Sequence, residues 1–461
     1  MIKFAATKKE SPQGRNRTGF NKIQNYESKI KHFRLIESRL SQFLSSFTIY
    51  FKSQTRNGAV NALLYLKGLM VCRRRNCQVM SEEVPQASQQ RLHHFITVSR
   101  WCYRKLMDKI TVDFWQLLQQ NGLENDTCLI IDESGNPKKG KHSAGVKRQY
   151  CGQIGKTENC QVGVFGALCG GSLVNLVQSR LLLGAGATKI DLAKEIIQQV
   201  VSVLKVRVKW VCFDAFYGRD THLLCSLIKI GLPFVADVPD NIRIWLEPFQ
   251  MRVPPKVANT PGRKHIYAKP NRESVSIRGY ADSLKKKDWK WMKIRHQSKG
   301  RLLFAWFHSR EIYIYNPITQ KRQLLHFLIR KDVDGTVKYS LCYQPGATLR
   351  QLAYMQCKRF FIEKSFREAK KELGLNQYQT RSAQSWHKHM AMVMLGQLFI
   401  NTQKTFCYSR EKLWLTTQDT ILLVRSVLKM TLRTVAQIIS TILAKQPSNY
   451  KKLKKLLFIR I

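Results

Sequence analysis

The sequence is poor in acidic residues: across 461 residues, 30 Asp and Glu stand against 78 Lys and Arg, for a formal net charge of +48. Because the cations occur along the whole length, the chain repels itself unless a polyanion neutralises it. The composition therefore predicts a nucleic-acid partner and strongly salt-dependent binding. A basic surface that serves only solubility is the competing interpretation.

Cys-x-x-Cys pairs are absent from the sequence, although it has 12 cysteines. Most of them lie in apolar runs, as Cys128 does, where a free thiol packs as a small hydrophobe. This usage is typical of a reducing compartment, so we expect an intracellular protein. Cys72 and Cys77 with His93 and His94 can be drawn as a zinc site, but their spacing fits no standard zinc finger.

Long apolar runs are also missing, although 44% of the residues are hydrophobic. The longest run, around residues 390–400, falls short of the roughly 20 residues that span a bilayer. Lys3, Lys8 and Lys9 stand where a signal peptide would need an apolar core. We therefore expect a soluble protein with a sizeable core and no membrane partner.

Apolar periodicity divides the chain into segments. Residues 1–30 are polar, basic and without a period, and helical spacing dominates from there to residue 122. Strands are predicted at 128–131, 206–213 and 233–238, with helices at 190–204 and 221–229 between them. This alternation is the mark of an α/β domain.

Between residues 241 and 347 the alternation stops, and segments rich in β-formers predict strands at 274–279, 301–308, 312–315 and 337–343. Helices resume at Leu349. The predicted division is a flexible basic arm (1–30), a helical DNA-binding domain (31–122), the first part of an α/β core (123–240), a β-rich insertion (241–347), the second part of the core with a catalytic helix (348–405), and a helical basic C-terminal region (406–461).

Three carboxylates are the candidates for catalysis. Asp132 and Asp214 each follow an apolar strand directly, and strand ends are where an open α/β sheet presents catalytic groups. Glu363 lies on a predicted helix, 352–373, on one line with Arg359 and Lys370. Three carboxylates together can hold two Mg²⁺ for phosphodiester chemistry. The competing interpretation is two aspartates that cap turns and a solvated helix with i,i+4 ion pairs.

A second motif, Gly135 to His142, nearly matches the phosphate loop G-x-x-x-x-G-K-[ST]. His142 replaces the metal-binding hydroxyl, however, and the continuation does not read as the helix that such a loop requires. Nucleotide binding is therefore the disfavoured interpretation, and we expect these cations to grip a nucleic-acid backbone. The residues concerned are Lys138, Lys139, Lys141 and Arg148.

Three stretches resemble the DDE transposases of bacterial insertion sequences, in the branch with a β-rich insertion before the final Glu. They read DESGNPKKGKHSAGVKRQYCGQIGKTENCQVGV (132–164), FDAFYG (213–218) and RFFIEKSFREAKKELGLNQY (359–378). The similarity runs from about residue 50 to 400. The resemblance implies an RNase H-like core with a metal-bound Asp-Asp-Glu triad at Asp132, Asp214 and Glu363.

The family signature Y-x2-R-x3-E-x6-K places its Arg and Lys on Arg359 and Lys370, so both are expected to contact DNA. Its Tyr position is Gln356, a departure that puts any tyrosine role in doubt, although Tyr354 is close. Glu133 adjoins Asp132 and competes with it for the first position of the triad. We assign Asp132, because alternation along a strand would point Glu133 the other way.

The implied activity is cut-and-paste transposition: binding of terminal inverted repeats, metal-dependent cleavage, and strand transfer into target DNA. The expected cofactor is two Mg²⁺ per site, with Mn²⁺ as a substitute, and the expected assembly is a dimer on DNA in the bacterial cytoplasm, associated with the nucleoid. The alternatives are an RNase H-like nuclease that only hydrolyses, and an inactive DNA-binding protein descended from a transposase.

Overall fold

The computed structural model describes residues 35–52, 57–184, 186–255, 266–296, 302–411 and 415–428. The arm predicted at 1–30 lies outside these residues, as does the basic tail from residue 429 onward. The chain forms two compact units. The first comprises Met1–Cys102, Glu368–Gln379 and Leu395–Ile461, and the second Tyr103–Arg367 and Thr380–Met394.

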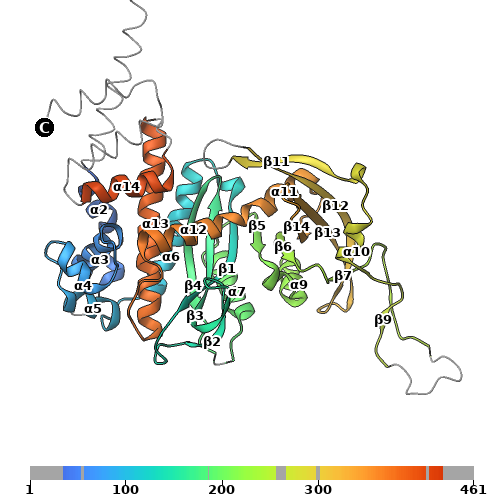
Figure 1. The fold of residues 1–461 in the computed structure, drawn as a ribbon, viewed down its shortest axis with the longest axis horizontal. Helices are drawn as coiled ribbons and strands as arrows, with labels where there is room; N and C mark the ends of the chain where they lie inside the picture. Colours follow the sequence, from blue (N-terminus) through green and yellow to red (C-terminus); the bar gives the residue numbers. More distant parts are fainter. Residues whose placement is uncertain are drawn as a thin grey trace, which may run out of the picture. The chain divides into compact units, whose positions relative to one another are not determined.

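The first unit is helical in its described part. Helix α3 is apolar on nearly all sides and packs against α2, α4, α5 and α14 (Figure 1). Asn76 begins α4 because its side chain accepts a hydrogen bond from the amide of Val79, and Phe51, Phe95 and Trp101 stack in the core. The helices are α2 (Ile36–Ser45), η1 (Thr48–Phe51), α3 (Ala59–Val71), α4 (Cys77–Glu83), α5 (Gln89–Thr97) and α14 (Thr417–Leu428).

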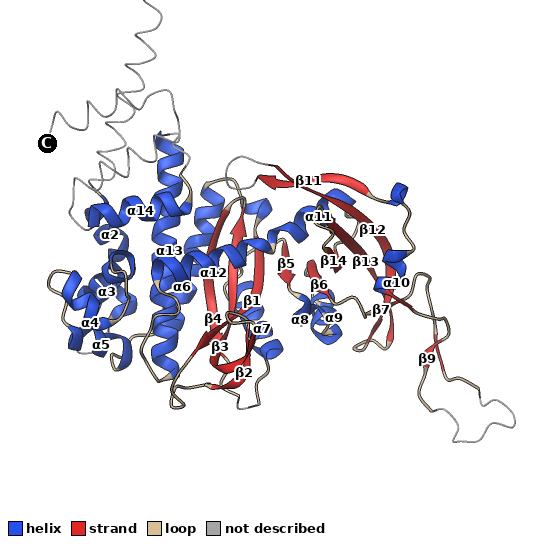
Figure 2. Cartoon of the chain, in the orientation of Figure 1, coloured by secondary structure: helices blue, strands red, loops and turns tan. Residues whose placement is uncertain are grey.

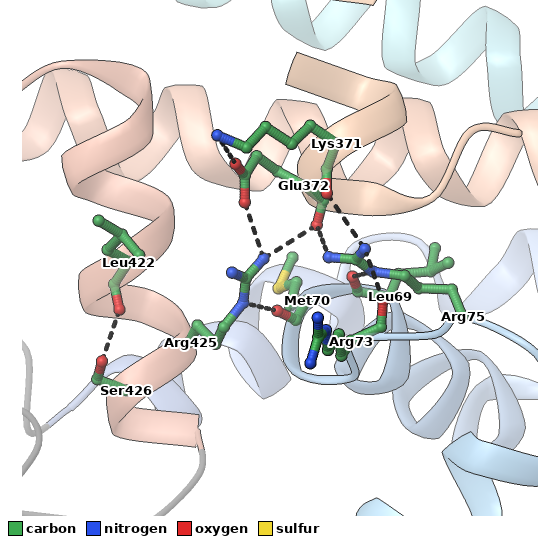
Figure 3. Close-up of polar contacts among 9 residues, drawn as sticks. All are labelled: Leu69, Met70, Arg73, Arg75, Lys371, Glu372, Leu422, Arg425 and Ser426. Atoms are coloured by element: carbon green, nitrogen blue, oxygen red, sulfur yellow. Dashed lines mark hydrogen bonds and ion pairs between the residues drawn. The ribbon is translucent and has the colours of Figure 1, made fainter. Parts of the chain in front are cut away.

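Two arginines of the first unit bind the last carbonyls of α3 and of α12 (Phe360–Leu373), as Figure 3 shows. Buried Arg75 donates to the Glu372 carbonyl at 2.7 Å and to the Leu69 carbonyl at 3.3 Å. Arg425 donates to the Met70 carbonyl at 2.8 Å and to the Glu372 carboxylate at 3.0 Å. The last carbonyls of a helix have no partner within it, so these contacts satisfy both helix ends.

The second unit is built on a mixed ten-stranded sheet (Figure 2). Its central strand β1 pairs parallel with β5, and β5 pairs parallel with β6. On the other side, β3 runs antiparallel to β1 and carries both β2 and β4. Antiparallel strands β14, β13, β12 and β11 continue the sheet beyond β6. The α/β class predicted from the sequence is therefore confirmed.

The strand bounds follow the apolar runs of the sequence, and Cys128 to Ile131 at the start of β1 are fully buried. Two short ribbons, β7 with β10 and β8 with β9, lie outside the large sheet. The strands are β1 (Cys128–Pro137), β2 (Lys147–Cys151), β3 (Lys156–Gly170), β4 (Leu173–Leu181), β5 (Trp210–Phe213), β6 (Phe234–Val238), β7 (Arg243–Ile244), β8 (Met251–Arg252), β9 (Lys269–Pro270), β10 (Val275–Ser276), β11 (Lys290–His296), β12 (Leu302–Asn316), β13 (Lys321–Asp332) and β14 (Val337–Tyr343).

Helices pack on this sheet. The long α6 lies on β3 and β4, α7 lies on β3 and β4 as well, and α11 lies on β5, β6 and β11 to β13. Asp220 caps α9, the helix predicted at 221–229, through the Leu223 amide. These helices are α6 (Tyr103–Gln120), η2 (Glu124–Asp126), α7 (Lys189–Ile197), η3 (Gln198–Val203), α8 (Ala215–Gly218), α9 (Thr221–Lys229), α10 (Ile277–Asp282), η4 (Lys286–Asp288), α11 (Leu349–Lys358) and α13 (Ala383–Glu411).

Two of the differences from the predicted elements concern helices. The strand expected at 274–279 is mostly helix α10, because the Ser276 side chain accepts from the Gly279 amide and caps it. The single helix expected at 352–373 divides at Arg359 into α11 and α12. Hydrogen bonds of i to i−3 spacing, from Arg359 to Gln356 and from Ile362 to Arg359, replace the α-helical pattern at this junction. No helix in the described ranges is both long and apolar enough to cross a membrane.

Candidate active site

Asp132 lies in β1 at the carboxyl edge of the parallel strands. Parallel pairing of β1 with β5 ends at Ile130, two residues before it. The strand predicted at 128–131 is longer in the structure, because the antiparallel ladder with β3 continues past Asp132 to Pro137. The carboxylate is therefore held on a regular strand, and its Oδ1 accepts from the Glu133 amide at 2.8 Å.

Asp214 follows β5 directly and begins the short helix α8. Its Oδ1 accepts hydrogen bonds from the amides of Phe216 at 3.0 Å and Tyr217 at 3.2 Å. The Asp214 side chain therefore both caps α8 and lies near Asp132. Gly218 closes this turn: a Cβ there would lie 1.9 Å from the Asp237 carbonyl oxygen, so only glycine lets α8 approach β6 this closely.

Asp132, Glu133 and Asp214 form an acidic cluster. One carboxylate oxygen from each lies within 4.8 Å of the other two. Across the described ranges, this is the single group of three or more His, Cys, Asp or Glu side chains close enough to hold a metal ion. Like charges at this spacing are costly unless a cation lies among them, and an all-oxygen donor set suits hard cations such as Mg²⁺.

Two carboxyl groups of the cluster, those of Asp132 and Asp214, have pKa values above their ordinary range. Burial, and then the charge of Asp214, raise the pKa of Asp132 to about 8, although Arg359 opposes this shift. Burial and the charge of Glu133 also raise the pKa of Asp214. Both directions mean that the folded chain disfavours the ionised cluster by itself, as expected of a site built to receive a cation.

Glu133 lies in the cluster, although the alternation of side chains along a strand predicts that it points away from Asp132. Its side chain is one methylene longer than that of Asp132, and Lys189 Nζ contacts its Oε1 at 2.6 Å. Its Oε2 and the hydroxyl of Tyr217 are both buried, and Tyr217 interacts with Glu133 there. Burial and the charge of Glu133 raise the pKa of Tyr217. The donor set of Glu133, Asp132 and Asp214, all carboxylate oxygens, fits a hard divalent cation.

Arg359 joins Glu363 to this cluster. Its Nη2 contacts Glu363 Oε1 at 2.6 Å, its Nε contacts Asp237 Oδ2 at 3.1 Å, and its Nη1 lies 3.8 Å from Asp132 Oδ2. Burial alone would lower the pKa of Arg359, but the charges of Asp237, Glu363 and Asp132 raise it. Glu363 lies in the first turn of α12, where the helix dipole favours a carboxylate, and its side chain is 43% exposed.

Asp237, on the third parallel strand β6, anchors Arg359 within a chain of hydrogen bonds. The Gln356 amide donates to Ser340 Oγ at 2.6 Å, and Ser340 Oγ donates to Asp237 Oδ1 at 2.6 Å. Asp237 Oδ2 in turn holds the guanidinium. Gln356, the residue that departs from the family signature, is therefore the start of a relay that fixes Arg359.

Comparison with known proteins gives the site its context. A family model described as "DDE superfamily endonuclease" matches residues 42–186. The curated protein "Probable transposase for insertion sequence element IS701" from Microchaete diplosiphon is 25% identical over 354 residues, which cover 73% of this chain and 81% of that protein. This chain is similar to the DDE-type insertion-sequence transposases. The predicted resemblance is confirmed.

A solved structure, "Cryo-EM structure of piggyBac transposase synaptic complex with hairpin DNA (SNHP)", also matches. It covers 93% of this chain and 84% of that chain, with 10% sequence identity and a TM-score of 0.37. Similarity at this level carries no argument about fold or function. The family match contains Asp132 and Glu133 but ends before Asp214 and Glu363. The match therefore says nothing about the roles of Asp214 and Glu363.

The cations predicted to grip DNA lie on and after the β1–β2 connection. Lys139, Lys141 and Arg148 are exposed, and burial lowers the pKa of the half-buried Lys138 to about 8. The connection leads into strand β2 with no helix, which contradicts a nucleotide-binding phosphate loop. Lys370 belongs to the first unit, whereas the carboxylates belong to the second.

Three polar residues of the site escaped the sequence prediction: Asp237, Lys189 and Tyr217. Asp237 was within reach, because it lies near the end of a predicted apolar strand, as Asp132 and Asp214 do. Tyr217 stands inside the FDAFYG motif but had no role assigned. Lys189 opens α7 and carries no local signal, since only the packing of α7 on the sheet brings it to Glu133.

Proposed function

We propose that this protein is a DDE transposase that binds the terminal inverted repeats of an insertion sequence, cleaves at its ends and transfers the strands by a cut-and-paste route. The observation that supports the proposal is that Asp132 and Asp214 lie together with Glu133, and that Arg359 contacts both Asp132 and Glu363. These residues come from parts of the chain far apart in sequence.

The strand arrangement supports an RNase H-like core as part of this proposal. Order β4-β3-β1-β5-β6, with β1, β5 and β6 parallel and β3 antiparallel, places Asp132 and Asp214 on adjacent parallel strands. Residues 241–347, proposed as the insertion, contribute β7 to β14, of which β11 to β14 extend the same sheet.

Asp132, Asp214 and Glu363 are the proposed ligands of two Mg²⁺, with Glu133 near enough to contribute a further oxygen. Bound Mg²⁺ supplies activation of the attacking oxygen and stabilisation of the leaving oxygen in phosphodiester chemistry. Mn²⁺ is expected to substitute. The protein's part is to hold the carboxylates on a rigid strand and at two helix ends, so that their spacing changes little during the reaction.

Arg359 can serve this chemistry in two ways. Its contacts with Asp237 and Glu363 fix the position of Glu363, and its planar guanidinium also suits a phosphate oxygen. Lys138, Lys139, Lys141 and Arg148, with Lys370, are proposed to hold the DNA backbone. A dimer on DNA is proposed because both ends of an element must be held together.

The test is Glu363→Gln, which removes the charge and keeps the shape. We expect loss of Mg²⁺-dependent cleavage and strand transfer on a plasmid that carries the DNA flanking the gene, with thermal stability and DNA affinity nearly unchanged. Glu368→Gln on the same helix is the matched control. If Glu363 made only an exposed ion pair, its loss would cost a few tenths of a kcal/mol and cleavage would survive.

The products separate the proposal from its alternatives. Cleavage without strand transfer by the wild type would favour a nuclease that only hydrolyses. DNA binding without any cleavage in Mg²⁺ or Mn²⁺ would favour an inactive DNA-binding descendant. Glu363→Gln that cleaves at the wild-type rate would remove Glu363 from the site.

A further inference from the structure

A run of cations interleaved with tryptophans leads into the edge strand β11. Residues 285–294 read KKKDWKWMKI, with five lysines against one aspartate. β11 is the last strand of the large sheet, and three strands separate it from β6 and the carboxylates. Lysines alternating with aromatic rings are typical of surfaces that bind nucleic acid, because the rings take bases and the lysines take phosphates.

The strand register gathers the aromatic rings on one face of the sheet. Trp291 pairs with Trp306, Lys293 pairs with Phe304, and Trp306 pairs in turn with Lys331 of β13. The Trp291 and Phe304 rings are stacked, with centroids 5.5 Å apart and planes 8° apart, and the Trp291 and Trp306 centroids lie 4.9 Å apart. We call Trp291, Phe304 and Trp306 the aromatic strip.

The fold does not need this strip in its core. Ala305 and Phe307, which alternate with the strip residues on β12, point to the other face and are 0% and 1% exposed. Trp291 remains 46% exposed, although a tryptophan is the side chain with most apolar area to bury. An exposed tryptophan in contact with two half-buried aromatic rings makes an apolar patch, which is the mark of a binding surface.

The charged residues around the aromatic strip indicate which kind of partner it binds. The acids nearest in sequence are already engaged: Asp288 accepts from the Lys285 amide at 2.8 Å, and Arg330 contacts Asp332 at 2.7 Å. Lys286 and Lys287, just before β11, are exposed, and so is Lys331 beside Trp306. An aromatic surface with a cationic border complements a polyanion that carries flat rings, which is the chemistry of unpaired nucleotides.

We propose that the aromatic strip binds single-stranded DNA, with bases stacked on Trp291 and phosphates near Lys331 and the lysines that precede β11. Duplex DNA keeps its bases stacked inside the helix and cannot use the ring faces. The site is distinct from the carboxylate cluster and requires no metal. It goes beyond the proposed function and depends on it only for the view that DNA is a partner.

The experiment measures fluorescence anisotropy of a labelled oligo(dT) of about 15 nucleotides and of a blunt duplex of the same length, with full-length protein in EDTA. Trp291→Leu keeps apolar volume against Phe304 but has no flat ring. We expect it to weaken single-strand binding about 5- to 150-fold, which corresponds to the loss of one stacked base. Duplex affinity should change less than about twofold. Trp291→Phe should retain most single-strand affinity.

A second aromatic residue provides the control for Trp291. Tyr267→Ala removes a more exposed aromatic ring elsewhere in 241–347 and should leave single-strand binding unchanged. Equal affinity of wild type and Trp291→Leu for oligo(dT) would overturn the proposal, and so would equal losses for oligo(dT) and duplex. A shift in oligomeric state without a change in DNA affinity would make the strip a protein interface instead.

The aromatic-strip proposal and the proposed transposase function are tested independently. Glu363→Gln should bind oligo(dT) as the wild type does, because the measurement contains no metal and no cleavage. Quenching of tryptophan fluorescence by unlabelled oligo(dT) gives a second readout, which should shrink in Trp291→Phe even where affinity is kept. Unchanged quenching in that variant would place the stacked base on another tryptophan and overturn the assignment of Trp291.

Discussion

Asp132→Asn should stabilise the metal-free protein near neutral pH. Asp132 has a pKa of about 8 in the folded chain against an ordinary value of 3.8, because burial and Asp214 disfavour its ionised form. A carboxyl whose folded pKa is raised binds its proton more tightly in the folded state, so its ionisation lowers stability progressively as pH rises from about 4 to about 8. At pH 7 the penalty is on the order of 4 kcal/mol.

Asparagine removes this penalty and keeps the oxygen that accepts from the Glu133 amide. We expect Asp132→Asn to unfold at higher temperature than the wild type at about pH 8 in EDTA, and the gap to close toward about pH 4. Differential scanning calorimetry across this range is the assay. Asp240→Asn, which changes an exposed aspartate paired with Arg278, is the matched control and should show no such gain.

Added Mg²⁺ should narrow the difference in stability between the two proteins. A ligand that binds only the folded state stabilises it by about 2.7 kcal/mol at a concentration of 100 times its Kd. The wild type should gain this stabilisation and Asp132→Asn should gain less, because one of its ligands is neutral. The reasoning is refuted if Asp132→Asn is no more stable than the wild type at about pH 8 in EDTA, or if its gain is the same at every pH.

Other predictions follow from the ion pairs. Arg75→Met should cost about 3–5 kcal/mol of stability in urea unfolding, because it removes a buried donor to the Leu69 and Lys371 carbonyls and one of the two donors to the Glu372 carbonyl. Exposed Arg73→Met should change stability by less than about 0.5 kcal/mol, and equal effects would contradict the role of Arg75. Asp237→Asn should slow single-turnover cleavage about tenfold without changing DNA affinity, since it loosens Arg359 and with it Glu363; an unchanged rate would remove the relay from the mechanism. DNA affinity of the whole chain should fall steeply with salt on a log–log plot, and a flat response would exclude a backbone-gripping role for the cation excess.

Several elements could be predicted from local sequence because their signals are local. The strand at 337–343, the cap at Asp220 and the helical segments before residue 122 match their apolar runs and capping residues closely. Asp132 and Asp214 are candidates for the same reason, since each stands directly after an apolar run. The length of β1 was not predictable in this way, because its continuation past Asp132 depends on pairing with β3.

Side-chain contacts between distant residues could not be predicted from local sequence. The run Arg73-Arg74-Arg75 shows three equal cations in the sequence, yet only Arg75 is buried, because only it faces the carbonyls at the end of α12. The helix predicted across Arg359 breaks there, and the guanidinium meets Asp132, Asp237 and Glu363. No spacing along the chain reveals contacts among residues separated by more than a hundred positions.

The sequence by itself determined the charge of the protein, the alternation of strands and helices in its α/β part, and two of the acidic positions, because composition and periodicity are properties of neighbouring residues. The tertiary structure decided which acids share a site, that Glu133 joins them, that Asp237 and Gln356 fix Arg359, and that Trp291, Phe304 and Trp306 share an exposed face. Those outcomes depend on strand register and helix packing, which bring distant residues together and are set by the fold as a whole.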